Sequence, residues 1–240
     1  LDGYKTRTSN TEKVQRVILP PRAKHQLATL KYIRCRSHQA HDIINPKYIR
    51  NLYRIYFCDT GRYANRIIMP VFDLAGNIVS FTNRATDDER TKSLHAKGIE
   101  IGNYAYGLFE AQTKRKCVLV EGQFDLYQVV SVIKLIPMLH DFGVVALLGT
   151  ALPIIRKELL ASMFEEIFVM LDHNNEALER SEEIAWELDQ DVEVKNVTDK
   201  YPKGKDPGVC TIAEIKKALL SESKEETFLD ELRESVGWNC

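Results

Sequence analysis

The sequence lacks any apolar run that approaches the roughly 18 to 20 residues needed to cross a bilayer. The stretch from Leu1 to Asn10 also lacks the basic segment and the following apolar segment of a secretion signal. These two absences predict a soluble, unsecreted protein of the cytoplasm with no membrane partner. No repeat period and no low-complexity tract is present either.

Cysteine is scarce and shows no pairing pattern. The five cysteines are an odd number, and no two of them form a Cys-x-x-Cys pair. This excludes a disulfide framework and a zinc ribbon, and it suits a reducing compartment. The cysteines are Cys35, Cys58, Cys117, Cys210 and Cys240.

The sequence does contain ample packing material. Of its 240 residues, 44% are hydrophobic and 28% are charged, which is enough for one sizeable core or two small ones and too much for a disordered chain. Because residue 1 is Leu rather than Met, we expect the sequence to be a piece of a longer protein.

Charge is divided unevenly along the chain. The formal total is −1, but residues 1–70 carry a net +10, residues 71–120 a net +1 and residues 121–240 a net −12. This asymmetry predicts a basic surface for a polyanion joined to an acidic region that holds cations. Two ordinary solvated faces would give the same counts, and charge alone does not decide between the two interpretations.

The first third of the chain predicts an arm, a helix and a β-hairpin. Residues 1–15 are polar and weakly patterned, which is typical of a linker. Apolar residues recur at helical spacing after Pro20 and Pro21. Two apolar runs, 67–72 and 78–82, flank turn residues and predict the hairpin. The helical positions are Ala23, Leu27 and Leu30.

The second half alternates short strands with helices. The strand runs are apolar on both faces and too short for helices, as buried parallel strands are. Such alternation implies right-handed crossovers and a parallel sheet with helices on both faces, so the predicted fold class is α/β. The predicted strands are 117–120, 144–148, 167–171 and 192–197, and the helices are 124–135, 153–163, 177–188 and one that opens with a capping box at Thr211 and Glu214.

Acidic residues follow three of these strands. Glu121 ends the first strand, with Asp125 one helical turn later; Asp172 follows the third, and Asp206 lies in the loop after the fourth. The carboxyl ends of parallel strands meet at one edge of a sheet, where functional groups gather. Clustered carboxylates repel one another unless a hard cation binds them, so the sequence predicts a divalent-metal site. Taken singly, each acid is equally typical of a helix N-cap.

These acids, in this order, resemble the Toprim domain of bacterial-type primases, topoisomerases and several nucleases, whose signature is a Glu on the first strand and Asp-x-Asp on the third. The residues before them resemble the polymerase core of DnaG-type primases in order and spacing, and the resemblance covers residues 19–220. The compact N-terminal part is similar to the primases of tailed bacteriophages. The matching segments are Arg66–Ile78, Phe81–Arg84, Lys92–Leu94, Lys97–Gly98 and Tyr106–Ala111.

The resemblance implies the catalytic core of a primase, which copies single-stranded DNA into short RNA from ribonucleoside triphosphates, uses Mg²⁺ or Mn²⁺ and has a replicative helicase as partner. It implies an arm at 1–18, a basic α+β subdomain at 19–113, a Toprim domain at 114–208 and a helical segment at 209–240. It also implies that Glu121 and Asp172 are the catalytic residues. The implied metal ligands are Glu121, Asp125, Asp172, Asn174 and Asp206, and the implied nucleotide and DNA contacts are Arg66, Arg84, Lys92, Lys97, Lys203 and Lys205.

The sequence departs from the family pattern at two acids. Asn174 replaces the second Asp of Asp-x-Asp, and Gly208 stands where many relatives carry another carboxylate. Both changes predict lowered metal affinity, with Glu176 as a candidate replacement ligand. The zinc module that usually precedes this core is not seen, because His38 and His41 have no Cys pair near them. No zinc site is therefore expected.

Three further patterns have plainer interpretations. Aromatic and basic residues interleave from Tyr48 to Tyr56, as on a surface that stacks single-stranded bases, but also as on a half-buried helix or strand. His173 fills the variable middle position of the acidic motif. The acids between Glu176 and Asp189 are typical of the solvated face of an amphipathic helix.

Two rival functions are compatible with part of the sequence. A Toprim nuclease needs the same metals with water as the nucleophile, but the primase-like residues 66–111 count against it. A catalytically inactive primase relic that binds only DNA or a helicase is compatible with Asn174 and Gly208. Metal binding and the product formed from a labelled strand separate the three functions.

Overall fold

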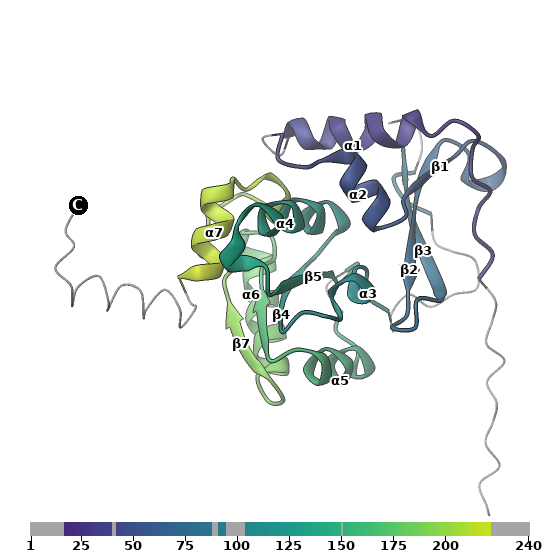
Figure 1. Ribbon diagram of the computed structural model, residues 1–240. Helices are drawn as coiled ribbons and strands as arrows, with labels where there is room; N and C mark the ends of the chain where they lie inside the picture. The colour runs from purple at the N-terminus through teal and green to yellow at the C-terminus, as the bar shows by residue number, and fades with distance from the viewer. Residues whose placement is uncertain (1–16, 40–41, 88–90, 95–103, 150, 222–240) are drawn as a thin grey trace, which may run out of the picture.

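The computed structural model describes residues 17–39, 42–87, 91–94, 104–149 and 151–221. Lys97, Cys240 and most of the predicted arm lie outside the described residues. The described chain forms an antiparallel sheet and a parallel sheet, with helices packed around them (Figure 1).

The antiparallel sheet contains the predicted hairpin and has the strand order β1-β2-β3. The turn between β2 and β3 is closed by Asp73, whose Oδ1 accepts hydrogen bonds from the N–H groups of Ala75 and Asn77 at 3.0 and 2.8 Å. β2 is buried along its whole length because it is the central strand. The elements are β1 (Tyr56–Cys58), the 3₁₀ helix η1 (Gly61–Tyr63), β2 (Arg66–Phe72) and β3 (Ile78–Ala85).

The first helix begins later than its apolar spacing predicts. The N–H of Ala23 donates to the carbonyl of Phe57 in β1 at 2.9 Å, and Gln26 Oε1 accepts from the N–H of Phe57 at 2.8 Å. These bonds hold residues 23–26 beside the strand, so the helix starts only at Leu27. The helices of this part are α1 (Leu27–Gln39) and α2 (Pro46–Leu52), and they pack against each other.

The parallel sheet has the order β5-β4-β6-β7, with every pair of neighbours parallel. Alternate residues of β4 enter two different cores, which confirms that helices cover both faces: Val118 packs with α4 and α7, whereas Leu119 packs with α3, α5 and α6. The elements are α3 (Leu108–Ala111), β4 (Lys116–Val120), α4 (Gln123–Leu135), η3 (Pro137–Leu139), β5 (Phe142–Ala146), α5 (Ile154–Met163), β6 (Glu166–Val169), α6 (Asn175–Leu188), β7 (Glu193–Asn196), η4 (Pro207–Val209) and α7 (Ile212–Leu220).

The strand order reverses beside β4. From β4 the chain crosses to β5 on one side, and it then returns to place β6 on the other side. In an open parallel sheet, the crossovers leaving such a point diverge and open a crevice at the carboxyl ends of the two strands. Here that crevice lies beyond the ends of β4 and β6, which lead into Glu121 and Asp172.

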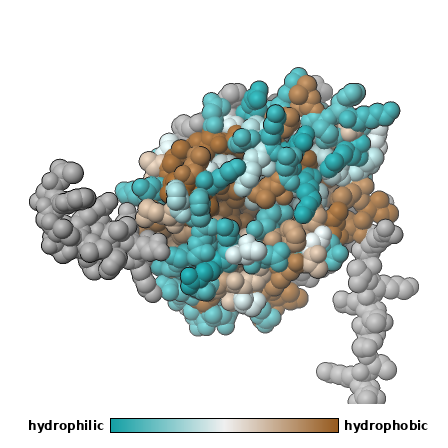
Figure 2. Space-filling model, viewed as in Figure 1, coloured by the Kyte–Doolittle hydropathy of each residue, from teal (hydrophilic) through white to brown (hydrophobic). Residues whose placement is uncertain are grey.

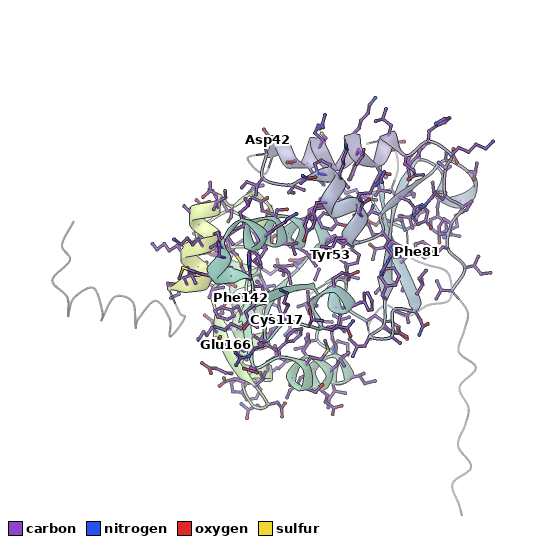
Figure 3. All side chains as sticks on the ribbon, viewed as in Figure 1. Asp42, Tyr53, Phe81, Cys117, Phe142 and Glu166 are labelled. Atoms are coloured by element: carbon purple, nitrogen blue, oxygen red, sulfur yellow. The ribbon has the colours of Figure 1, made fainter. Side chains whose placement is uncertain are left out.

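The two sheets share one core rather than meeting at a solvated boundary. Tyr53, which is labelled in Figure 3, follows α2 and lies in the interior between the two sheets. It stacks on Tyr106 with ring centroids 5.2 Å apart, and the hydroxyl groups of Tyr106 and Tyr127 lie 2.8 Å apart. Tyr53 and Tyr56 are 2% and 3% exposed, so these two tyrosines of the interleaved aromatic pattern belong to the protein interior. The predicted subdomains at 19–113 and 114–208 therefore pack through a continuous apolar interior.

No helix in the described part of the chain has the length and apolar character needed to cross a membrane. Hydrophilic side chains cover much of the face shown in Figure 2, with smaller apolar patches between them.

Candidate active site

Four acidic side chains, from the ends of three strands, line one pocket. Glu121 directly follows β4, Asp125 lies in the first turn of α4, Asp172 follows the end of β6, and Asp206 lies in the loop after β7. The pocket has a volume of about 280 Å³. The fold thus brings the strand-end acids together at the crevice that the strand order creates.

Backbone hydrogen bonds continue beyond the strands and hold the first two strand ends. The N–H of Leu148 donates to the carbonyl of Glu121 at 3.0 Å, so Glu121 still lies in the pairing of β4 with the β5 side. The N–H of Met170 donates to the carbonyl of Leu119 at 2.9 Å, and Asp172 follows two residues later. Both acids therefore start from backbone that the sheet holds in place.

His173 anchors the loop that carries Asp206. Its N–H donates to the carbonyl of Lys205, and its own carbonyl accepts from the N–H of Gly204, each at 2.8 Å. Its ring Nδ1 lies 2.5 Å from the carbonyl oxygen of Tyr201. The variable middle residue of the acidic motif thus has a structural role, which the sequence pattern alone did not indicate.

Burial and mutual repulsion raise the pKa values of two of the acids. Burial, and then the charges of Asp206 and Asp172, raise the pKa of Asp125 to about 8. Burial, and then the charges of Glu121 and Asp206, raise the pKa of Asp172 to about 6. Full ionisation of the acids in this pocket is therefore unfavourable near neutral pH, and a bound cation would make it more favourable.

The chemistry of the donors suits a hard divalent cation. Carboxylate oxygens from separate strands are ligands of the kind that Mg²⁺ and Mn²⁺ prefer. The pKa values of Asp125 and Asp172 are raised first by burial and then by mutual repulsion, and a bound cation offsets both effects. Within the described residues, however, no group of three or more His, Cys, Asp or Glu side chains is already arranged to hold an ion. The fit is therefore one of donor type and location, without a preformed coordination shell.

Asn174 serves as the N-cap of α6. Its Oδ1 accepts a hydrogen bond from the N–H of Ala177 at 2.9 Å, and the residue is exposed. It lines a neighbouring pocket of about 460 Å³ together with Glu121, Asp172 and Glu176. Asn174 therefore stands beside the acids, as the sequence predicts, but its oxygen already has a backbone partner.

A larger cationic pocket opens beside the acidic one, between α1 and the end of β3. It has a volume of about 700 Å³, and Arg84 and Lys92 line it together with Lys31 and Arg36 of α1. Arg36 also lines the acidic pocket, where its guanidinium carbon lies 4.8 Å from the ring centroid of Phe124. The predicted basic groove and the predicted acidic site are thus adjacent.

Sequence reasoning missed Lys31 and Arg36. A run of basic residues in α1 is visible in the sequence, but the run contains Arg34 as well. Only the placement of α1 in the fold, where Tyr32 and Arg36 contact Phe124 of α4, selects the two that line these pockets. Arg34 lines a different pocket.

Three other predicted contacts lie away from the pocket surfaces. Arg66 is only 3% exposed and donates to the carbonyl of Thr91 at 2.8 Å, so it lies beneath the cationic pocket and supports the segment that contains Lys92. Lys205 Nζ donates to Glu214 Oε1 at 2.6 Å, which ties the loop of Asp206 to α7. Lys203 is exposed.

Comparison with known sequences identifies similar replication enzymes. The DNA primase of Clostridium acetobutylicum is 32% identical over an alignment of 158 positions, and this alignment covers 61% of this chain and 24% of that protein. The DNA primase of Deinococcus radiodurans is 31% identical over an alignment of 164 positions, and this alignment covers 63% of this chain and 27% of that protein. This chain is similar to bacterial DNA primases. It spans about a quarter of the length of these curated relatives, and no protein-family model matches it.

Solved primase structures share the fold. The zinc-binding and RNA polymerase domains of the Aquifex aeolicus primase superpose with a TM-score of 0.66 at 21% identity, covering 89% of this chain and 60% of that one. The DnaG primase catalytic domain bound to single-stranded DNA gives 0.59 at 16% identity, covering 88% and 74%. The primase fragment of the bacteriophage T7 primase-helicase protein gives 0.54 at 17% identity, covering 75% and 70%. The fold of this primase-like chain is therefore that of primase catalytic cores, which confirms the predicted α/β class.

Proposed function

We propose that this chain is the catalytic core of a DnaG-type primase with a Toprim domain, which synthesises short RNA on a single-stranded DNA template. The observation that carries the proposal is the adjacency of the acidic pocket and the cationic pocket, which share Arg36. Joining nucleotides needs these two environments next to each other, because metal-binding oxygens must meet the phosphates that basic side chains hold. The sequence similarity to bacterial DNA primases supports the same activity.

Each group of residues has a distinct part in this reaction. Glu121, Asp172 and Asp206 would hold Mg²⁺ or Mn²⁺, which when bound lowers the pKa of the primer 3′-hydroxyl and offsets charge on the leaving pyrophosphate. Arg36, Arg84 and Lys92 hold the triphosphate and the template backbone beside that point, since guanidinium groups grip phosphates bidentately. In the proposed reaction the 3′-hydroxyl loses its proton to water and its oxygen attacks the α-phosphate in line. The bond from the α-phosphate to the β-phosphate oxygen breaks, and pyrophosphate leaves.

The comparison with solved structures supports a proposal about the substrates and partners. One of the similar structures is a primase catalytic domain bound to single-stranded DNA, and another is part of a phage primase-helicase protein. We therefore infer a single-stranded DNA template, ribonucleoside triphosphates and a replicative helicase as partners, in the cytoplasm of a bacterial host. A phage origin of this chain belongs to the same proposal.

The central test replaces Glu121 with Gln. The variant keeps the shape of the side chain but removes its charge, so primer synthesis from ribonucleoside triphosphates on a single-stranded template should fall at least about a hundredfold. Binding of the same template, measured by fluorescence anisotropy, should change less than twofold, because the cationic pocket is intact.

Three outcomes would redirect the assignment. Equal primer synthesis by E121Q and the unmodified protein would remove the acidic pocket from the reaction. Shortening of a labelled strand by the unmodified protein with Mn²⁺ and no nucleotides would favour the nuclease. Intact DNA binding with no Mg²⁺ or Mn²⁺ binding in calorimetry would favour the inactive relic.

A further inference from the structure

Asp125 joins two loops that are far apart in the sequence. Its Oδ2 accepts a hydrogen bond from the N–H of Gly122 at 3.0 Å, at the start of its own helix. Its Oδ1 accepts a hydrogen bond from the N–H of Gly208 at 3.1 Å, two residues after Asp206. One carboxylate therefore ties the turn after β4, which carries Glu121, to the loop that carries Asp206.

The contact between α4 and this loop extends beyond Asp125. One helical turn later, Gln128 is fully buried, and its Nε2 donates to the carbonyl of Cys210 at 2.6 Å. The helix and the 3₁₀ turn η4 pack directly against each other. The Asp206 loop thus lies against α4, with Asp125 at the end nearest the pocket.

The absence of a side chain at residue 208 makes this contact possible. A Cβ on Gly208 would lie 2.8 Å from Asp125 Oδ1 and 3.0 Å from Asp206 Oδ1, and the first of these distances is too short for any real contact. Moving Asp125 away would break its hydrogen bond with the N–H of Gly208, and the added methyl group cannot accept a hydrogen bond in its place. A side chain at 208 and the present position of Asp125 therefore exclude each other.

We propose that Asp125 is a positioning residue, whose carboxylate holds Asp206 at the pocket and requires Gly208 to do so. In this interpretation the glycine at position 208 does more than remove a carboxylate that many relatives carry. Because it has no side chain, it leaves room for the Asp125 carboxylate to bind the loop. The inference rests on the proposed function, because it concerns the placement of a metal-binding acid.

The first test measures thermal unfolding in EDTA, so that no metal contributes. G208A should lower the melting temperature by about 5 °C, because its methyl group displaces Asp125. D125A should lower it by a similar amount. In the double variant D125A/G208A the methyl group enters the vacated space, so the combined loss should be no larger than that of either single variant. Strictly additive losses would overturn the inference.

The second test asks whether the site itself changes. Mn²⁺ binding is measured by calorimetry at a temperature well below all the unfolding transitions, for the full chain, G208A and D125N. D125N keeps the shape of the side chain but can accept properly from only one of the two N–H groups. Both variants should bind Mn²⁺ about tenfold more weakly, although Gly208 has no side chain that could ligate it. Amide hydrogen exchange in the Asp206 loop should quicken in both.

Asp73 provides a matched control. Its carboxylate also accepts two backbone hydrogen bonds, from Ala75 and Asn77, but in the hairpin turn between β2 and β3. D73A removes both of these bonds, so it should lower the melting temperature while leaving Mn²⁺ affinity unchanged. If G208A and D125N also left Mn²⁺ affinity unchanged, the positioning role would be refuted although the proposed function stands. If the unmodified protein bound no Mn²⁺, the proposed function would fail first.

Discussion

Among the residues that the structure describes, carboxyl groups with raised pKa values occur at two places, where burial is the largest cause and the further causes differ. In the acidic pocket, Asp125 and Asp172 are raised by burial together with the charges of neighbouring acids. Glu110, on α3, lies among tyrosines instead, and burial alone raises its pKa to about 7, with Arg54 opposing the shift from 3.7 Å. The raised pKa values to which several neighbouring acids contribute are therefore those of the candidate active site, whereas that of Glu110 arises from burial alone.

Glu110 makes the protein less stable as the pH rises. Its pKa of about 7 in the folded protein exceeds the usual value of 4.5, so the folded state keeps a proton that the unfolded state has lost. Its contribution to stability is therefore complete below about pH 4.5 and is lost as the pH rises through about 7, by up to about 3 kcal/mol.

The variant E110Q cannot titrate, so its stability relative to the unmodified protein should improve by about 2 kcal/mol between pH 5 and pH 8. Urea unfolding at the two pH values measures this change, and Asp125 and Asp172 cancel from it because both proteins contain them. A difference independent of pH would mean that Glu110 is ionised in the folded state.

The short helix α3 depends on a particular backbone conformation at its N-cap residue, Gly107. Gly107 precedes it with φ +89°, and a Cβ there would lie 2.7 Å from both Leu126 Cδ1 and the carbonyl oxygen of Val144. This residue lets the chain pass between α4 and β5 before it enters β4. A residue with a side chain would be strained in conformation and would also collide with two elements.

A comparison of the variants G107A and G61A separates the free-energy cost of the strained backbone conformation from the cost of the steric collision. Gly61 also has a positive φ, +66°, but nothing lies within 4 Å of its added Cβ. G61A should therefore lose about 1 kcal/mol of stability from conformation alone, whereas G107A should lose about 3 kcal/mol or more. Urea denaturation of both variants measures the losses. Equal losses would show that the chain at Gly107 moves aside freely.

At the scale of the whole molecule, part of the uneven charge of the sequence lines two adjacent pockets, one acidic and one basic. The basic residues come from α1, the end of β3 and the segment after it, and the acidic ones from the strand ends of the parallel sheet. Much of the negative charge of the second half lies elsewhere, on the exposed face of α6, as the helical spacing predicts. The pockets therefore use only a small part of the total charge asymmetry.

R84A should weaken binding of single-stranded DNA about tenfold at low salt, because Arg84 lines the cationic pocket. The slope of log affinity against log salt should also fall by about 0.7, as expected for the loss of one phosphate contact to a single strand. R115A is the control, because Arg115 pairs with Glu165 at the opposite end of β4. Anisotropy titrations at several salt concentrations give both quantities, and equal slopes for all three proteins would remove Arg84 from the DNA surface.

The sequence by itself determined the α/β alternation, the hairpin and the acids at the strand ends, because apolar periodicity and turn residues are local signals. Most predicted bounds of strands and helices agree with the structure to within a few residues, and α1 differs because a partner in β1 holds Ala23. The resemblance carried by residues 66–111 pointed to primases before any packing was known.

Only the tertiary structure decided which side chains of a shared type have which role. In the folded protein Arg66 is buried, whereas Arg36 lines the acidic pocket. Asn174 caps α6, and the ring of His173 contacts the carbonyl of Tyr201. Asp125 accepts a hydrogen bond from Gly208. The physical reason is that these roles depend on contacts between segments distant in the sequence, such as the 83 residues that separate Asp125 from Gly208. No local pattern records such a contact, because either partner alone is compatible with many folds.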